Sequence, residues 1–268
     1  MHGTNYDTFS RGDAKSGACA VILVKKRPSI RPPQTKLGTS PRQHTLNRTI
    51  MKRLLILALA AATSLSFAAE HPDTTGWKDL FVTDLSNTVA PGGWSFTEGV
   101  LVAKDHDTLW TKESYGDFIL DLEFKVTTES NSGVFLRSGD IKNVLAALEI
   151  QVHDSKDGSK YGSKYGMVGA IYDACPPSKS MAKPLGEWNH FTITCKGSLV
   201  SIVFNGEEVI HADLDKWPEV GQNPDGTPNK FKKALKDFAR SGPIGLQGLH
   251  GKAQAPVWYR NLKIKVIE

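Results

Sequence analysis

Apolar and polar residues alternate along several short stretches of the chain, a pattern typical of strands that bury one face. In the clearest stretch, residues 118–126, the polar residues Asp121, Glu123 and Lys125 separate a regular series of apolar side chains. Such alternation predicts an antiparallel strand with one face in the core and one in solvent. Further short strands are predicted at residues 134–136, 148–152, 168–172, 191–195, 200–204, 209–212, 244–247 and 262–267.

Turn-forming residues separate these strands. Asn205-Gly206 lies between two apolar runs and predicts a type I′ hairpin, because both central residues of that turn take positive φ. Lys196-Gly197-Ser198 predicts a second turn. Residues 87–102, rich in glycine, predict short strands joined by turns.

One segment has a helical period instead. Phe231, Ala234, Leu235 and Phe238 are spaced at i, i+3, i+4 and i+7, so we expect a short amphipathic helix near residues 229–240. Its apolar stripe is expected to pack on the strands, and a lid over a site is the alternative. Eight or more short strands with one helix predict an all-β sandwich of two sheets, or a jelly roll.

The N-terminal part of the chain has a different composition. Residues 51–69 combine two basic residues, a run of Leu, Ile and Ala, and a small-residue end, which is the pattern of a secretory signal peptide. The apolar run is too short for a membrane span. We therefore expect a periplasmic or secreted domain at residues 70–268. Residues 1–50 are interpreted as the result of a misplaced start, or alternatively as a genuine leader or a disordered basic arm.

The net charge changes once this leader is set aside. The whole chain has 33 Lys and Arg against 28 Asp and Glu, a net charge of +5 that on its own suggests a nucleic-acid partner. Residues 1–53 hold eleven of the basic residues and two of the acidic ones, so the rest of the chain carries −4. No nucleic-acid partner is therefore expected.

Two cysteines fall in the expected mature domain. Export would permit a disulfide between Cys175 and Cys195. However, Cys195 lies on the same side of its predicted strand as Phe191 and Ile193, so a small buried core residue is the simpler interpretation. The sequence leaves both possibilities open.

Candidate chemistry is concentrated between residues 131 and 154. In the strand predicted at residues 148–152, Leu148, Ile150 and Val152 would face the core. The alternate positions then form a row of a carboxylate, an amide and an imidazole about 7 Å apart on the other face. These residues are Glu149, Gln151 and His153.

The strand predicted at residues 134–136 would add Phe135 and Arg137 to the same surface. If the two strands pair, a carboxylate, a guanidinium, an imidazole and an aromatic ring come together, which favours a ligand site. The alternative is the solvated outer face of an ordinary sandwich.

Seven short motifs follow one another in a distinctive order. They are NSGVFLR at 131–137, LEIQ at 148–151, GAIY at 169–172, GEWN at 186–189, NG at 205–206, GPIGLQ at 242–247 and YRN at 259–261. In this order they resemble the 3-keto-disaccharide hydrolase domain family, over nearly all of residues 76–268. The resemblance implies a concanavalin-like jelly roll, export, and cleavage of glycosides whose sugar is oxidised to a ketone at C3.

One segment departs from the family pattern. The family usually has Gln-Asp-His-Gly where this chain has Gln247-Gly248-Leu249-His250-Gly251, with one extra residue and no Asp. This leaves two possibilities for His250. Either it is displaced from the site, or the insertion bulges outward and His250 keeps its place.

The residue types indicate which chemistry a site here could perform. Ordinary glycosidases use two carboxylates, whereas the row on residues 149–153 has one. A 3-keto sugar needs a base for its C2 proton, a positive or hydrogen-bonding group at the ketone oxygen, and a proton for the leaving oxygen. For the base we consider Glu149, His153 or His250, for the enolate oxygen Arg137 or a divalent metal ion, and for the leaving-group proton Tyr172 or a histidine.

The expected partner is a carbohydrate. Side chains expected to contact it are Asn131, Phe135, Gln151, Tyr172, Trp188 and Gln247. Two other functions stay open: a non-catalytic carbohydrate-binding module, and a conventional glycosidase with acids from separate strands. The grouping of Glu149, His153 and Arg137 favours an enzyme.

Overall fold

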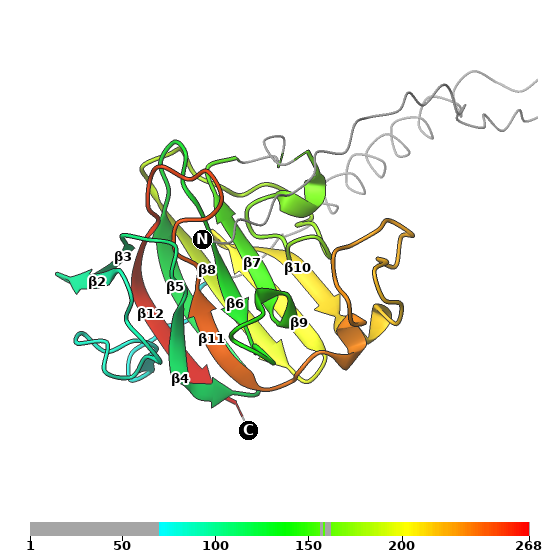
Figure 1. The fold of residues 1–268 in the computed structure, drawn as a ribbon, viewed down its shortest axis with the longest axis horizontal. Coiled ribbons are helices and arrows are strands. Elements are labelled where there is room, and N and C mark those ends of the chain that lie inside the picture. Colours follow the sequence, from blue (N-terminus) through cyan, green and yellow to red (C-terminus); the bar gives the residue numbers. More distant parts are fainter. Residues whose placement is uncertain (1–69, 156–157, 159–161, 268) are drawn as a thin grey trace, which may run out of the picture. The chain divides into compact units, whose positions relative to one another are not determined.

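A computed structural model describes residues 70–155, 158 and 162–267. These residues form two antiparallel sheets packed face to face, which confirms the predicted all-β sandwich (Figure 1). The predicted signal peptide at residues 51–69 and the leader at 1–50 lie outside the described residues.

The larger sheet has the strand order β10-β9-β8-β5-β12-β3-β2, and β1 pairs with β12. Its strands are β1 (Lys78–Asp79), β2 (Trp94–Thr97), β3 (Val100–Ala103), β5 (Phe118–Lys125), β8 (Trp188–Lys196), β9 (Leu199–Phe204), β10 (Glu207–Asp213) and β12 (Trp258–Val266). The β9–β10 hairpin turns at Asn205 and Gly206, whose φ values of 49° and 84° confirm the predicted turn.

The smaller sheet has the order β4-β11-β6-β7. Its strands are β4 (Leu109–Tyr115), β11 (Gly242–Leu246), β6 (Asn131–Leu136) and β7 (Leu148–His153). The strands β6 and β7 pair in the register that places Glu149 opposite Phe135 and Gln151 opposite Gly133. The described 3₁₀ turns are η1 (Val144–Ala146), η3 (Lys164–Gly166), η4 (Leu214–Lys216) and η5 (Leu235–Asp237).

The core lies between the sheets and takes every second residue of the central strands. Ile150 and Val152 of β7 are fully buried in it, as the alternation predicts. Phe124, Phe191 and Phe204 come from three neighbouring strands and pack with successive ring centroids 4.6 Å apart. Burying each such ring stabilises the fold by about 1.5–3 kcal/mol.

The helix predicted at residues 229–240 is not formed. This segment, drawn in orange between β10 and β11 in Figure 1, contains only the 3₁₀ turn η5. The four apolar residues that suggested the helix are nevertheless buried. Their side chains reach the core from a largely irregular backbone. The backbone of this segment forms hydrogen bonds to other segments; for example, Lys236 N–H donates to Trp217 O. Hydrogen bonds to distant segments have therefore taken the place of the hydrogen bonds within a helix.

The strand predicted at residues 168–172 is also absent, apart from isolated bridges at Ile171. Positive φ at Gly169 (84°) and Asp173 (64°) bends the chain at both ends. The segment still lies against β7, because Gln151 N–H donates to Ala170 O and Tyr172 N–H donates to Glu149 O. It therefore covers the free edge of the smaller sheet.

Both cysteines of the described domain are free thiols, so the disulfide is not formed. Cys195 is a buried core residue, and burial raises the pKa of its thiol to about 12. None of the helical turns in the described part of the chain has the length and apolar character that crossing a membrane would require.

Candidate active site

A cavity of about 580 Å³ opens beside β6 and β7, on the face of the smaller sheet turned away from the core. Its polar lining includes Asn131, Glu149, Gln151, Tyr172, Lys230, Gln247 and His250. All of these except Lys230 are predicted site residues. The structure therefore brings together most of the residues that the sequence suggested.

Glu149 lies at the middle of this group. Its side chain is 11% exposed, and burial raises the pKa of its carboxyl, an effect that the nearby Lys230 opposes. The carboxylate has room only because residue 133 on the paired strand is glycine. A Cβ atom added to Gly133 would come within 2.7 Å of Glu149 Oε1.

Lys230 is the functional candidate that the sequence did not reveal. Its Nζ lies 3.6 Å from Glu149 Oε2 and 3.9 Å from the centroid of the Tyr172 ring. Burial lowers the pKa of its amine, while Glu149 and Asp173 act in the opposite direction. The segment carrying Lys230 is far from β7 in sequence, and no local pattern marks the contact.

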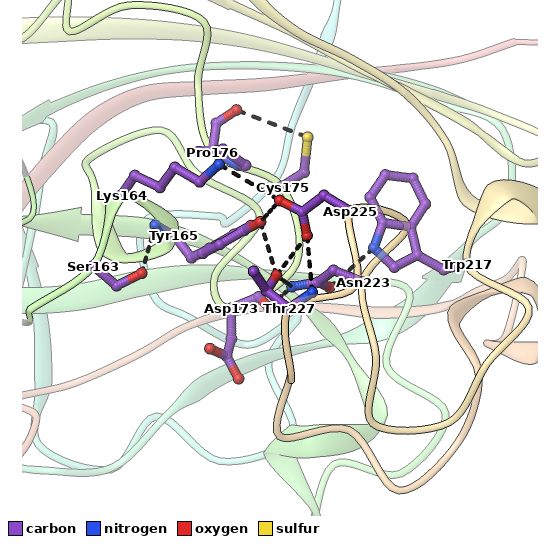
Figure 2. A network of polar contacts seen from close by, with 10 residues as sticks. All are labelled: Ser163, Lys164, Tyr165, Asp173, Cys175, Pro176, Trp217, Asn223, Asp225 and Thr227. Carbon is purple, nitrogen blue, oxygen red and sulfur yellow. Dashed lines mark hydrogen bonds and ion pairs between the residues drawn. The ribbon is translucent and has the colours of Figure 1, made fainter. Parts of the chain in front are cut away.

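A polar network holds the loop that leads to Lys230 (Figure 2). Asp225 accepts hydrogen bonds from Tyr165 and Thr227, and Asn223 Nδ2 donates to the backbone oxygen of Asp173. The Asp173 carboxylate then accepts the Lys230 backbone N–H at 2.6 Å. Asp173 also follows Tyr172, so one short turn fixes both the amine and the ring beside it.

Two amide side chains complete the lining with unused acceptors. Asn131 Oδ1 and Gln247 Oε1 are buried and have no hydrogen-bond partner among the described residues, although both residues line the cavity. Buried polar atoms are normally paired, so such atoms point to a ligand that supplies donors. Sugar hydroxyl groups are donors of this kind.

His250 keeps a place in the cavity despite the extra residue before it. The insertion is accommodated against residues 105–107: Leu249 N–H donates to Asp105 O, and a Cβ on Gly248 would meet that oxygen at 2.5 Å. Burial and the nearby Lys230 lower the pKa of His250. Its imidazole is therefore neutral near pH 7.

Residues 71–265 match the family described as the 3-keto-alpha-glucoside-1,2-lyase-like domain. The chain belongs to this family. A relative named 3-keto-disaccharide hydrolase, from Bacteroides thetaiotaomicron, is 24% identical over 271 residues, covering 88% of this chain and 92% of the relative.

Solved structures agree with this fold. A crystal structure of a proposed glycosyl hydrolase from Parabacteroides distasonis ATCC 8503 is 37% identical with a TM-score of 0.66, covering 71% of this chain and 99% of that one. A second proposed glycosyl hydrolase from the same organism is 22% identical with a TM-score of 0.54, covering 76% of this chain and 94% of that one. The expected jelly-roll architecture is confirmed.

In this member of the 3-keto-alpha-glucoside-1,2-lyase-like family, Arg137 does not reach the cavity. The strand β6 ends at Leu136, and Arg137 takes a left-handed φ of 48° that redirects its side chain. The guanidinium is buried and donates to Gly116 O, Gly197 O and the Asp117 carboxylate. Its role is to join chain segments, and the prediction that it meets an enolate oxygen is wrong.

His153 is also outside the cavity. Its Nδ1 accepts from Ser155 N–H, so its Nε2 carries the proton and donates to Gly166 O. The residue is 1% exposed. Because both nitrogens are engaged in backbone contacts, His153 is not placed to act as a base.

The two predicted aromatic contacts lie elsewhere as well. Phe135 is fully buried and stacks on Trp110 with centroids 5.5 Å apart. Trp188 begins β8 of the larger sheet, where Arg260 lies over its ring at 4.1 Å. Neither ring lines the cavity.

Residues that could hold a metal ion lie on the outer face of the larger sheet. One ligand atom each from His71, Asp121 and His190 falls within 4.8 Å of the others. However, both ring nitrogens of His71 are engaged in hydrogen bonds. The Thr192 hydroxyl gives its proton to Asp121, so its oxygen accepts a hydrogen bond from His71 Nδ1–H. The Gly206 N–H donates to His71 Nε2. Burial lowers the pKa of His71 to about 4. This neutral ring has no free nitrogen, so the group fits a hydrogen-bonded network better than a metal site.

Proposed function

We propose that this protein cleaves glycosides whose sugar carries a ketone at C3, and that cleavage begins with removal of the C2 proton. The observation that carries the proposal is the pair of a buried Glu149 and a half-buried Lys230, 3.6 Å apart in one cavity. A base beside a cation is what formation of an enolate requires. Membership of the family, and a relative named 3-keto-disaccharide hydrolase, support the keto substrate.

Five of the cavity residues have a part in this reaction. Glu149 removes the C2 proton, and the positive charge of Lys230 stabilises the electrons that move toward the C3 oxygen. The C1 substituent then leaves, and water adds to the double bond between C1 and C2. The proton that Glu149 took from C2 passes through His250 to the leaving oxygen, because a neutral imidazole accepts a proton on one nitrogen as it gives one from the other. Asn131 and Gln247 accept hydrogen bonds from sugar hydroxyls.

The ketone makes this route accessible to a site with one central carboxylate. It acidifies the neighbouring C2–H bond, so that a glutamate can act as the base. Direct displacement at C1 would need a second carboxylate at a defined distance on the other side of the bond. Elimination needs only a base, an electrophile and a proton exchanger.

A matched pair of substrates tests the proposal. A disaccharide and its 3-keto derivative are incubated separately with the protein, and the released sugars are quantified. We expect cleavage of the 3-keto sugar and no detectable cleavage of the parent. Equal cleavage of both sugars, or of neither, would contradict the proposal.

A second candidate function rests on Glu129, which also lines the cavity. Together with Glu149 it could form the two-carboxylate pair of a conventional glycosidase. That enzyme would cleave the parent disaccharide and would lose activity when either glutamate is replaced. The same substrate pair, with a Glu129→Gln variant added, therefore separates the two candidates.

We also propose that the domain is exported, because residues 51–69 have the tripartite signal pattern. N-terminal sequencing of the native protein should place the mature start near Ala69 or Glu70. A mature chain that retains Arg42 or Arg48 would contradict export by this signal.

A further inference from the structure

We infer that Lys230 acts covalently: its amine condenses with the C3 ketone to form an iminium, and this iminium activates the C2 proton that Glu149 removes. The inference rests on the proposed function and adds to it a covalent bond between Lys230 and C3 of the sugar. In place of a fixed ammonium that only stabilises an enolate, Lys230 becomes the electron sink of the elimination.

The spacing of the two groups suits this role. An amine bonded to C3 and a carboxylate that reaches the proton on C2 serve adjacent carbon atoms, so they must lie within a few ångströms of each other. Lys230 Nζ and Glu149 Oε2 are 3.6 Å apart in the cavity. That separation is longer than a close charge-assisted hydrogen bond, which leaves the amine accessible to a carbonyl carbon.

The amine is also held in place. The Lys230 backbone N–H bonds the Asp173 carboxylate at 2.6 Å, and the Tyr172 ring lies beneath Nζ at 3.9 Å. The backbone N–H of Tyr172 in turn donates to the backbone oxygen of Glu149, the residue that carries the carboxylate. Base and amine are therefore fixed to one another through a short chain of contacts, as a reaction at adjacent atoms requires.

The surroundings favour the protonation states that iminium formation needs. A neutral amine attacks the carbonyl, and an acid must protonate the hydroxyl that leaves as water. Burial lowers the pKa of Lys230 and raises the pKa of Glu149, so both shifts favour a neutral amine beside a neutral acid. The charged groups nearest the amine are Glu149 and Asp173, with His250 also facing it.

The steps balance without any added reagent. The neutral amine adds to C3, Glu149 protonates the carbinolamine hydroxyl, and water leaves to give the iminium and the Glu149 carboxylate. The carboxylate takes the C2 proton and yields an enamine, which expels the C1 oxygen with a proton and regenerates a conjugated iminium. Water adds at C1, C2 regains a proton, and hydrolysis of the iminium returns the 3-keto sugar and the free amine.

Reductive trapping tests the bond directly. The full-length protein is incubated with a 3-keto disaccharide and sodium cyanoborohydride, which reduces iminium ions faster than ketones, and is then digested for mass spectrometry. We expect one adduct on Lys230, with the mass of the bound keto sugar less water plus two hydrogens. The parent disaccharide should give no adduct.

Variants separate this inference from the function on which it rests. Lys230→Arg keeps the positive charge but cannot form the iminium, so its turnover should fall about as far as that of Lys230→Ala. Lys252→Arg, which changes another lysine of the cavity lining, is the matched control and should retain turnover and the adduct. Circular dichroism checks that each variant is folded.

Three results would overturn the inference. If the wild-type protein turns over the 3-keto sugar without an adduct on Lys230, the iminium is wrong and the proposed function stands. The iminium is also wrong, and the proposed function stands, if the turnover of Lys230→Arg stays within about tenfold of wild type. That is the outcome expected when Lys230 acts only through its charge. If the 3-keto sugar is neither cleaved nor trapped, the inference and the proposed function fall together.

Discussion

At the scale of single residues, the proposed reaction depends on Glu149. Replacing it with Gln removes the base while preserving shape, so turnover of a 3-keto glycoside should fall by roughly 10²–10⁴-fold. Glu129→Gln is the matched control, because Glu129 also lines the cavity but has no part in the proposed reaction. Steady-state kinetics on both variants checks this. Comparable losses would favour the two-carboxylate mechanism.

The pKa of Glu149 predicts a pH profile for the free enzyme. Glu149 and Lys230 must hold one dissociable proton between them: on Lys230 where it acts as a cation, and on Glu149 where the neutral amine attacks the ketone. Activity is lost once Glu149 is protonated beside a charged Lys230, and burial raises the pKa of Glu149. The value of kcat/KM should therefore fall as the pH drops through that raised pKa, with an acid limb above the ordinary range of a glutamate. An acid limb within the ordinary range would mean that Glu149 is not the base.

The sequence predicted the direction of some site residues and not of others. The outward direction of Glu149 and Gln151 followed from alternation, because a strand buried on one face fixes the direction of every second side chain. Arg137 could not be placed in that way. The strand ends one residue earlier and the backbone turns left-handed, which moves the buried guanidinium into an ion pair with the partly exposed Asp117.

At the scale of elements, the loop of residues 221–230 decides whether the site is complete. Asp173→Gly should remove the carboxylate that holds Lys230 N–H, while glycine accepts the φ of 64° at this position. We expect turnover to fall by roughly 10–100-fold, because Nζ loses its fixed position. Asp84→Ala, which removes a turn hydrogen bond at Ser86 in another loop, is the control for kinetics. Unchanged turnover in Asp173→Gly would show that the network does not position the amine.

The same region explains why the element prediction failed there. Phe231, Ala234, Leu235 and Phe238 have helical spacing, and their burial was correctly predicted. Spacing alone does not reveal that backbone groups of this segment bond to Asp173 and Trp217, which lie elsewhere in the chain. The contact between Lys230 and Glu149 depends on those distant bonds, so the pattern of a single segment could not predict it.

At the scale of the whole molecule, the His71 network joins the first described residues to the outer face of the larger sheet. His71 stacks on His190 with ring centroids 3.4 Å apart and bonds to Thr192 and Gly206. Burial lowers its pKa from 6.5 to about 4, with His190 adding to the shift. The unfolded chain therefore binds more protons between these two pH values, and the free energy of unfolding should fall as the pH drops from about 6.5 to about 4.

Denaturant unfolding at several pH values checks this prediction. His71→Ala should unfold more easily at pH 7 and should show a shallower loss of stability across that window. His211→Ala is the control, since this histidine is exposed on β10. If the free energy of unfolding depends on pH equally in wild type and His71→Ala, His71 is not the source of that dependence.

The proposed reaction as a whole rests on one step, the removal of the proton on C2. The most direct measurement is turnover of a 3-keto disaccharide in deuterated water, with the released 3-keto sugar analysed by NMR and mass spectrometry. Free 3-keto sugar incubated alone and with Glu149→Gln corrects for exchange by tautomerisation in solvent. Removal of the C2 proton predicts deuterium at C2 of the sugar released by the wild-type protein, beyond that correction. A product that carries no deuterium at C2 would contradict it.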